Sequence, residues 1–183
     1  MMKRMSIVLA AVMVLLTLAG CAQDIWGDQN LLEASSAVKG TAFSDEKGTF
    51  TLYAPDTFRD ATAEDADGSN LMLTDGELTI RVTVLDYVQN LAVTTEEDYA
   101  EEYKNLGMDM ISYTRGKVLG VNGLKIVGDY EDNGSAMQQL QYAANVDGHF
   151  VVFTCSYPTS AARNAKKNVS SILGSFSLAV EAN

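Results

Sequence analysis

Apolar and polar residues alternate along much of the chain from Thr41 onward, and this period of two predicts a protein built on a β-sheet. The most regular segment is Glu77 to Val84, in which every second residue is apolar, as in a strand with one buried face. The pair Asp75-Gly76 is a turn signal that joins this strand to a predicted partner strand from Asn70 to Thr74.

The second half of the chain predicts a meander of hairpins. Its turn signals are Asn122-Gly123, Asn133-Gly134 and Asp147-Gly148, and the expected strands cover residues 117–121, 124–130, 136–146 and 149–157. The last of these strands is apolar on both parities, so we expect a central strand that is covered on both faces. Nearer the N-terminus, Phe50 and Leu52 mark a further strand that ends at Pro55.

Two helices are predicted among the strands. The first follows Thr95, which forms a capping box with Asp98, and it ends at Gly107. The second begins near Ser160 and ends at Gly174. These elements predict an α+β fold with a central antiparallel β-sheet flanked by helices. Either both helices cover one face of the sheet, or one helix covers each face.

The segment before Cys21 has the layout of a secretion signal. Two basic residues precede an apolar run from Ser6 to Ala19, which is shorter than the ~20 residues that span a bilayer. A transmembrane helix and an ordinary cleaved signal are the alternatives, but the run ends in Leu18-Ala19-Gly20-Cys21, which resembles the lipobox of bacterial lipoproteins. The resemblance implies that residues 1–20 are removed and that a diacylglyceryl group is attached to the Cys21 thiol.

This interpretation divides the chain into a signal peptide (residues 1–20), a lipidated N-terminus and tether (21–40) and a single domain (41–183). Membrane lipid is then a partner through Cys21. The expected location is extracytoplasmic, on the outer face of the cytoplasmic membrane or on the periplasmic side if an outer membrane exists. The apolar residues of the tether either pack on the domain or the membrane interface, or belong to a short helix that docks on a partner: Ile25, Trp26, Leu31 and Leu32.

The charge and the cysteine content limit the partners that the protein can bind and the bonds that can stabilise it. Without residues 1–20, the chain keeps 11 of its 13 basic residues against 24 acidic ones, a net charge of −13. Nucleic-acid binding needs many Lys and Arg contacts to phosphate, so we expect no nucleic-acid partner. With Cys21 lipidated, only Cys155 remains, so no intramolecular disulfide forms and stability must come from a packed core.

The order of elements resembles the Mog1/PsbP-like (DcrB-like) family. The similarity rests on Gly48–Pro55, Val121–Leu124, the strand Gly148–Cys155 and the tail Ile172–Phe176, and it covers about residues 41 to 178. It implies an α/β/α sandwich and a role as a binding or assembly module, as in a GTPase-binding factor and a photosystem subunit of that family. Its motifs are structural, and none is catalytic.

The sequence lacks a recognisable catalytic set, so we predict that the protein is not an enzyme and uses no cofactor. His149 is the single histidine, and six extended residues of ~3.3 Å each would place it ~20 Å from Cys155. A Gly-x-Ser-x-Gly nucleophile elbow is absent. A hydrolase that uses loop carboxylates is one alternative, because such groups can converge without a sequence signature.

Two sets of polar residues are candidate binding sites. Asp65, Asp67 and Asn70 crowd one loop and are either a cation site or a polar turn, although their register does not fit an EF-hand. The second set comprises polar residues predicted on one parity of three strands, which form either a ligand-binding floor or the flank of a covering helix: Arg81, Lys125, Gln139 and Gln141. We predict a non-catalytic binding or assembly module with an envelope protein as partner, and a cation- or small-ligand-binding lipoprotein as the alternative.

Overall fold

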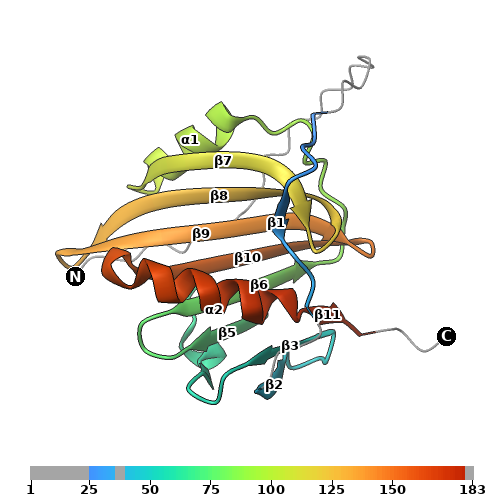
Figure 1. The fold of residues 1–183 in the computed structure, drawn as a ribbon, viewed down its shortest axis with the longest axis vertical. Coiled ribbons are helices and arrows are strands. Elements are labelled where there is room, and N and C mark those ends of the chain that lie inside the picture. The colour runs from blue at the N-terminus through green and yellow to red at the C-terminus, as the bar shows by residue number, and fades with distance from the viewer. Residues whose placement is uncertain (1–24, 36–39, 180–183) are drawn as a thin grey trace.

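A computed structural model describes residues 25–35 and 40–179, and it consists of two sheets and two helices (Figure 1). The strands of the larger sheet are, in spatial order, β1 (Asn30–Leu32), β7 (Asp109–Val118), β8 (Val121–Asp132), β9 (Ser135–Val146), β10 (His149–Pro158), β6 (Thr79–Leu85), β5 (Leu71–Thr74) and β4 (Arg59–Asp60). The smaller sheet has the order β11 (Ser177–Leu178), β3 (Phe50–Ala54), β2 (Thr41–Ser44). The helices are α1 (Glu96–Asn105) and α2 (Ala162–Gly174), with the 3₁₀ turns η1 (Thr62–Glu64) and η2 (Thr159–Ala161). The predicted α+β fold is confirmed.

One helix covers each face of the larger sheet. Its central strand β10 is buried on both sides, with Val152 4% and Phe153 0% exposed, as its apolar sequence predicts. Phe153 lies opposite Tyr142 of β9 and Val82 of β6, and these residues face α2. Val152 lies opposite Ala143 on the other face, which packs against α1.

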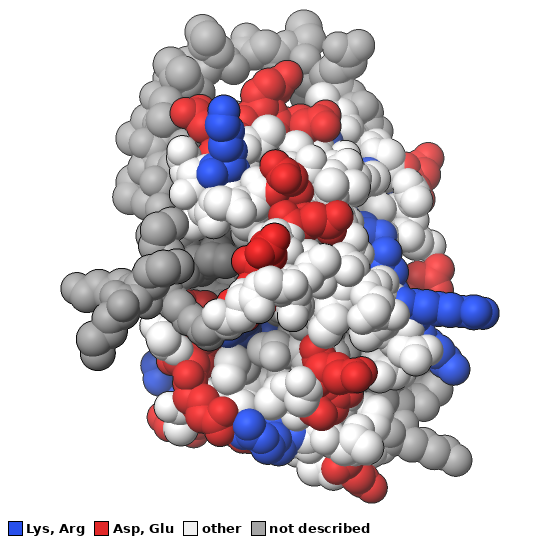
Figure 2. Space-filling model, turned by 90° about the vertical axis from the view of Figure 1, so that its left-hand side faces the viewer, with Lys and Arg blue, Asp and Glu red and all other residues white. Residues whose placement is uncertain are grey.

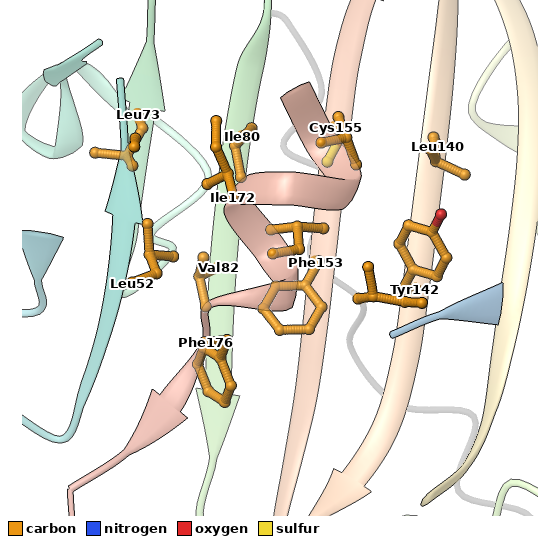
Figure 3. Close-up of a cluster of buried hydrophobic side chains, with 14 of the residues drawn as sticks. Leu52, Leu73, Ile80, Val82, Leu140, Tyr142, Phe153, Cys155, Ile172 and Phe176 are labelled. Carbon is orange, nitrogen blue, oxygen red and sulfur yellow. The ribbon is translucent and has the colours of Figure 1, made fainter. Parts of the chain in front are cut away.

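The α2 face contains the larger hydrophobic core. Ile172 and Phe176 contribute side chains from α2 and the residues after it, and they meet Phe153 and Val82 of the sheet (Figure 3). Leu52 of β3 joins the same cluster, because the smaller sheet lies beside α2 on this face (Figure 3). The sequence pattern identified this strand, but not its membership of a second sheet.

The α1 face depends on a close approach between the helix and β8. The predicted capping box is confirmed, since Asp98 N–H donates to Thr95 Oγ1 at 3.2 Å and Thr95 N–H donates to Asp98 Oδ2 at 2.8 Å. Tyr103 packs directly on Gly128, where a Cβ atom would lie 2.6 Å from the tyrosine ring. Glycine at position 128 therefore sets the distance between helix and sheet.

One predicted turn is wrong by three residues. The β7–β8 hairpin turns at Leu119-Gly120, both with positive φ (52° and 85°), and Asn122-Gly123 lies inside β8. Gly123 is needed there because a Cβ would lie 2.7 Å from the carbonyl oxygen of Ala143 on β9. The signal came from a glycine that serves strand packing instead of a turn. The strand before it is also longer than predicted, since β7 begins at Asp109.

Residues 25–35, which the sequence analysis assigns to the tether, pack on the domain. β1 pairs in parallel with β7, Leu32 is 3% exposed, and Ser35 N–H donates to the carbonyl oxygen of Gly174 at 2.6 Å. Trp26, Leu31 and Leu32 pack on the domain, whereas Ile25 is 41% exposed. Residues 25–35 contain no helix, so the predicted alternative of a short helix is wrong for them. Within the described ranges, no helix is long and apolar enough to cross a bilayer.

Candidate functional site

The loop that holds the predicted cation ligands is closed by internal hydrogen bonds. The Asp65 side chain is 1% exposed and accepts hydrogen bonds from Asp67 N–H (3.1 Å), Ser69 N–H (3.0 Å), Ser69 Oγ and Arg81 Nε (3.1 Å). Burial alone would raise the pKa of Asp65, but the hydrogen bonds from Ser69, Asp67 and Arg81 outweigh burial and lower it. The Asp65 carboxylate is thus directed at protein donors.

The other two predicted cation ligands also have protein partners. Asp67 Oδ2 lies 3.6 Å from Arg81 Nε, and Asn70 Oδ1 accepts a hydrogen bond from Val84 N–H at 2.7 Å. Among residues 25–35 and 40–179, no three His, Cys, Asp or Glu side chains form a group that could hold a metal ion. The loop carboxylates of Asp65 and Asp67, from one candidate site, therefore form ion pairs with Arg81, which was predicted to belong to the other candidate site.

The four predicted floor residues do not share one face of the sheet. Arg81, Gln139 and Gln141 lie on the α1 face, since Arg81 and Gln141 are both opposite Thr154 of β10. Lys125 lies opposite Tyr142 and so points to the α2 face. Lys125 and the two glutamines lie on the two strands of one hairpin. Its predicted turn, Asn133-Gly134, pairs Asp132 with Ser135 and hence Lys125 with Tyr142, so counting back from the turn places Lys125 on the face opposite the glutamines.

The two glutamines are covered by α1. They are 2% and 3% exposed, and Tyr103 Oη donates to Gln141 Oε1 at 3.1 Å while Gln139 Nε2 lies 3.4 Å from the same hydroxyl. Burial raises the pKa of Tyr103 to about 12, which keeps the hydroxyl protonated as a donor. These residues satisfy one another in the core and offer no open floor to a ligand.

Lys125, on the opposite face, is half-buried and lies over an aromatic ring. Its Nζ is 6.0 Å from the centroid of Tyr142. Burial, and after it the like charge of Lys166 on α2, lowers the pKa of Lys125.

His149 and Cys155 are separated along β10, as the sequence predicts. Cys155 is 0% exposed, and burial raises the pKa of its thiol. His149 is 40% exposed at the side chain, its Nδ1 lies 3.1 Å from the Asp147 carbonyl oxygen, and its Nε2 lies 3.8 Å from Asp86 Oδ1. Within the part of the chain that the structure describes, these two side chains do not form a nucleophile–base pair.

A shallow groove opens where the N-terminal segment meets the end of α2. It encloses about 570 Å³ and is lined by residues that include Ser35, Tyr53, Gly174 and Ser175. Tyr53 is 41% exposed, and its backbone N–H donates to Ser175 Oγ at 2.8 Å. Sequence patterns could not indicate this groove, because its walls come from distant parts of the chain.

The loop between β6 and α1, residues 86–95, carries a second feature that the sequence analysis missed. Tyr87, Val88 and Val93 are 46%, 63% and 55% exposed, whereas Leu91 is 3% exposed. The sequence signal was a group of apolar residues between a strand and a capping box. Their spacing follows neither the period of a strand nor that of a helix.

Charge does not single out a site on the face that lies at the left of Figure 1. Figure 2 shows that face: acidic side chains are scattered over it, and basic side chains lie between them. The acidic excess of the sequence is therefore distributed here instead of concentrated in one patch.

Comparison with family models and with curated protein sequences finds no match. Solved structures do match. Cyanobacterial PsbP (CyanoP) from Synechocystis sp. PCC 6803 aligns with a TM-score of 0.59 at 13% identity, over 80% of this chain and 97% of that chain. The Ran-binding protein Mog1p of Saccharomyces cerevisiae aligns with a TM-score of 0.54 at 12% identity, over 76% and 95%.

The chain has the Mog1/PsbP-like fold. A third structure, LpqN of Mycobacterium tuberculosis, which is involved in cell envelope biogenesis, aligns with a TM-score of 0.51 at 14% identity, over 79% of this chain and 88% of that chain. At these identities the likeness concerns the fold alone. The expected lipidation site, Cys21, and the signal peptide lie outside the described residues.

Proposed function

We propose that this protein is an extracytoplasmic lipoprotein, anchored through Cys21, that acts as a non-catalytic binding or assembly module for an envelope protein. The observation that carries the anchor is the tetrapeptide Leu18–Cys21 at the end of the apolar run. The fold adds support, because the domain begins to pack at Trp26 and leaves only a short link to Cys21.

A non-catalytic binding role is supported because the candidate reactive side chains pair with one another or are buried. Asp65 and Arg81 pair with each other, Gln139 and Gln141 are buried under Tyr103, and Cys155 is inaccessible. The Mog1/PsbP-like fold is also that of a Ran-binding protein and of a protein involved in envelope biogenesis. We place the partner contact at the groove beside Tyr53, since three separate segments of the chain meet there around a half-exposed aromatic side chain.

Site-specific photo-crosslinking in intact cells tests this proposal. A photoreactive residue at Tyr53 is expected to capture one envelope protein, and the adduct is expected to disappear when Cys21→Ala removes the anchor. Ile111 is a matched control, because it is 58% exposed on β7, outside the groove. No adduct at Tyr53, or the same adducts at both positions, would contradict the proposed contact.

A further inference from the structure

The 86–95 loop presents its apolar side chains on a rigid support. Asn145 of β9 holds the loop through both ends of its amide, because Gln89 N–H donates to Oδ1 at 2.9 Å and Nδ2 donates to the Gln89 carbonyl at 2.8 Å. Arg115 of β7 holds the other half, since its guanidinium donates to the carbonyl oxygens of Leu91 (3.1 Å) and Thr94. The outward direction of the exposed residues is thus set by contacts to the sheet.

The first described residues lie at the same end of the domain as this loop. The Arg115 guanidinium carbon is 5.1 Å from the centroid of the Trp26 ring, so one side chain joins the N-terminal segment to the loop. Figure 1 shows the blue segment that begins at residue 25 beside the lime-green loop that leads into α1. Ile25, next to Trp26, is itself 41% exposed.

The few residues between Cys21 and Ile25 limit the distance between a lipid anchor on Cys21 and this end of the domain. Ile25 follows Cys21 by four residues, and four extended residues span at most about 14 Å. An acyl chain on Cys21 would therefore hold this end of the domain against the membrane, and the opposite end away from it.

We infer that Ile25, Tyr87, Val88 and Val93 form a membrane-resting surface that lies in the interface of an electroneutral phospholipid bilayer. This inference rests on the proposed lipid anchor. Tyrosine suits the headgroup level, where its ring is buried and its hydroxyl stays wet, and the valines add apolar area. Fully exposed Asp86 and the acidic first turn of α1, beginning at Glu96, flank the surface and disfavour anionic lipid. A surface this small binds the membrane too weakly by itself, so it contributes only when the lipid anchor keeps it next to the bilayer.

An environment-sensitive fluorophore on a new cysteine tests the inference in the lipidated protein. Val88→Cys places the probe in the membrane-resting surface. Ile111→Cys is the control, because this position is comparably exposed and lies on β7 six residues away from Lys117, where β7 pairs with the N-terminal strand β1. Cys155 is buried and does not compete for the label. On phosphatidylcholine vesicles, quenching by brominated lipid is expected to be about twofold or more stronger at position 88 than at position 111. The same probe in Cys21→Ala protein is expected to show no quenching.

Each other outcome overturns the inference in a distinguishable way. If the protein floats with the vesicles but both probes remain in water, the anchor stands and the membrane-resting surface is wrong. If the position-88 probe is shielded only in native membranes and not on lipid vesicles, the loop binds a protein. If the protein neither floats nor carries lipid on Cys21, the inference and the proposed anchor fail together.

Discussion

At the scale of single residues, Asp65 shows how an apparent ligand can be a structural group. Its carboxylate is almost fully buried, and every hydrogen bond that it accepts comes from its own loop or from Arg81. Hydrogen bonds to a charged group contribute about 1.5–3 kcal/mol each when a partner is removed. The carboxylate therefore stabilises the loop over β6, and ionisation of Asp65 is linked to folding.

Asp65→Asn is expected to lower the free energy of unfolding by about 2 kcal/mol at pH 7, because the charged acceptor is lost. The folded pKa of Asp65 lies below its ordinary value, so its stabilisation is present above about pH 4 and is lost as the pH falls through the folded pKa. Urea titrations of both proteins at pH 7 and pH 3 should show this difference shrinking in acid. A pH-independent difference, or a rise in wild-type Tm with calcium that Asp67→Asn abolishes, would contradict the structural role and favour a cation site.

At the scale of elements, β1 makes the N-terminal segment an edge strand of the larger sheet instead of a flexible tether. Leu32 is 3% exposed in the α2-side core, and Gly116 of β7 has no space for a Cβ because Gln29 and Leu31 pack against it. The segment contributes both backbone pairing and apolar burial. Its loss would open the β7 edge and the core beneath it.

Leu32→Ala is expected to lower the free energy of unfolding by about 2–4 kcal/mol, as for other buried leucines. Gln29→Ala is the matched control, because that side chain is exposed three residues earlier and its backbone contacts are kept. Chemical denaturation measures both. Equal stability of the two variants would mean that residues 25–35 are a free tether after all.

The same scale shows where sequence reasoning succeeds and where it fails. The period of two along β6 and the capping box at Thr95 are local patterns, and both elements form as predicted. Gly123 was misread because a glycine needed for close approach looks like a glycine needed for a turn. The face of Lys125 follows from the register that the predicted Asn133-Gly134 turn sets, and the prediction did not apply that register. The groove at Tyr53 depends on contacts between distant segments, which no local pattern contains.

At the scale of the whole molecule, a link of four residues joins Cys21 to Trp26, the first residue that packs in the α/β/α sandwich. The link is shorter than a tether of residues 21–40 would be, so the proposed lipid on Cys21 would set which end of the domain faces the membrane. The groove at Tyr53 and the membrane-resting surface are formed by different segments. We therefore expect substitutions in the groove to leave the proposed anchor intact, whereas loss of the anchor is expected to abolish the Tyr53 crosslink in cells as well.

Mass spectrometry of the N-terminal peptide, taken from protein isolated from the membranes of the cells that make it, tests the proposed lipid anchor directly. We expect a chain that begins at Cys21 and carries a diacylglyceryl group on the thiol, and we expect this species to be lost in the Cys21→Ala variant. A chain that retains residues 1–20, or one cleaved elsewhere with an unmodified Cys21, would contradict the lipid anchor and the orientation inferred from it.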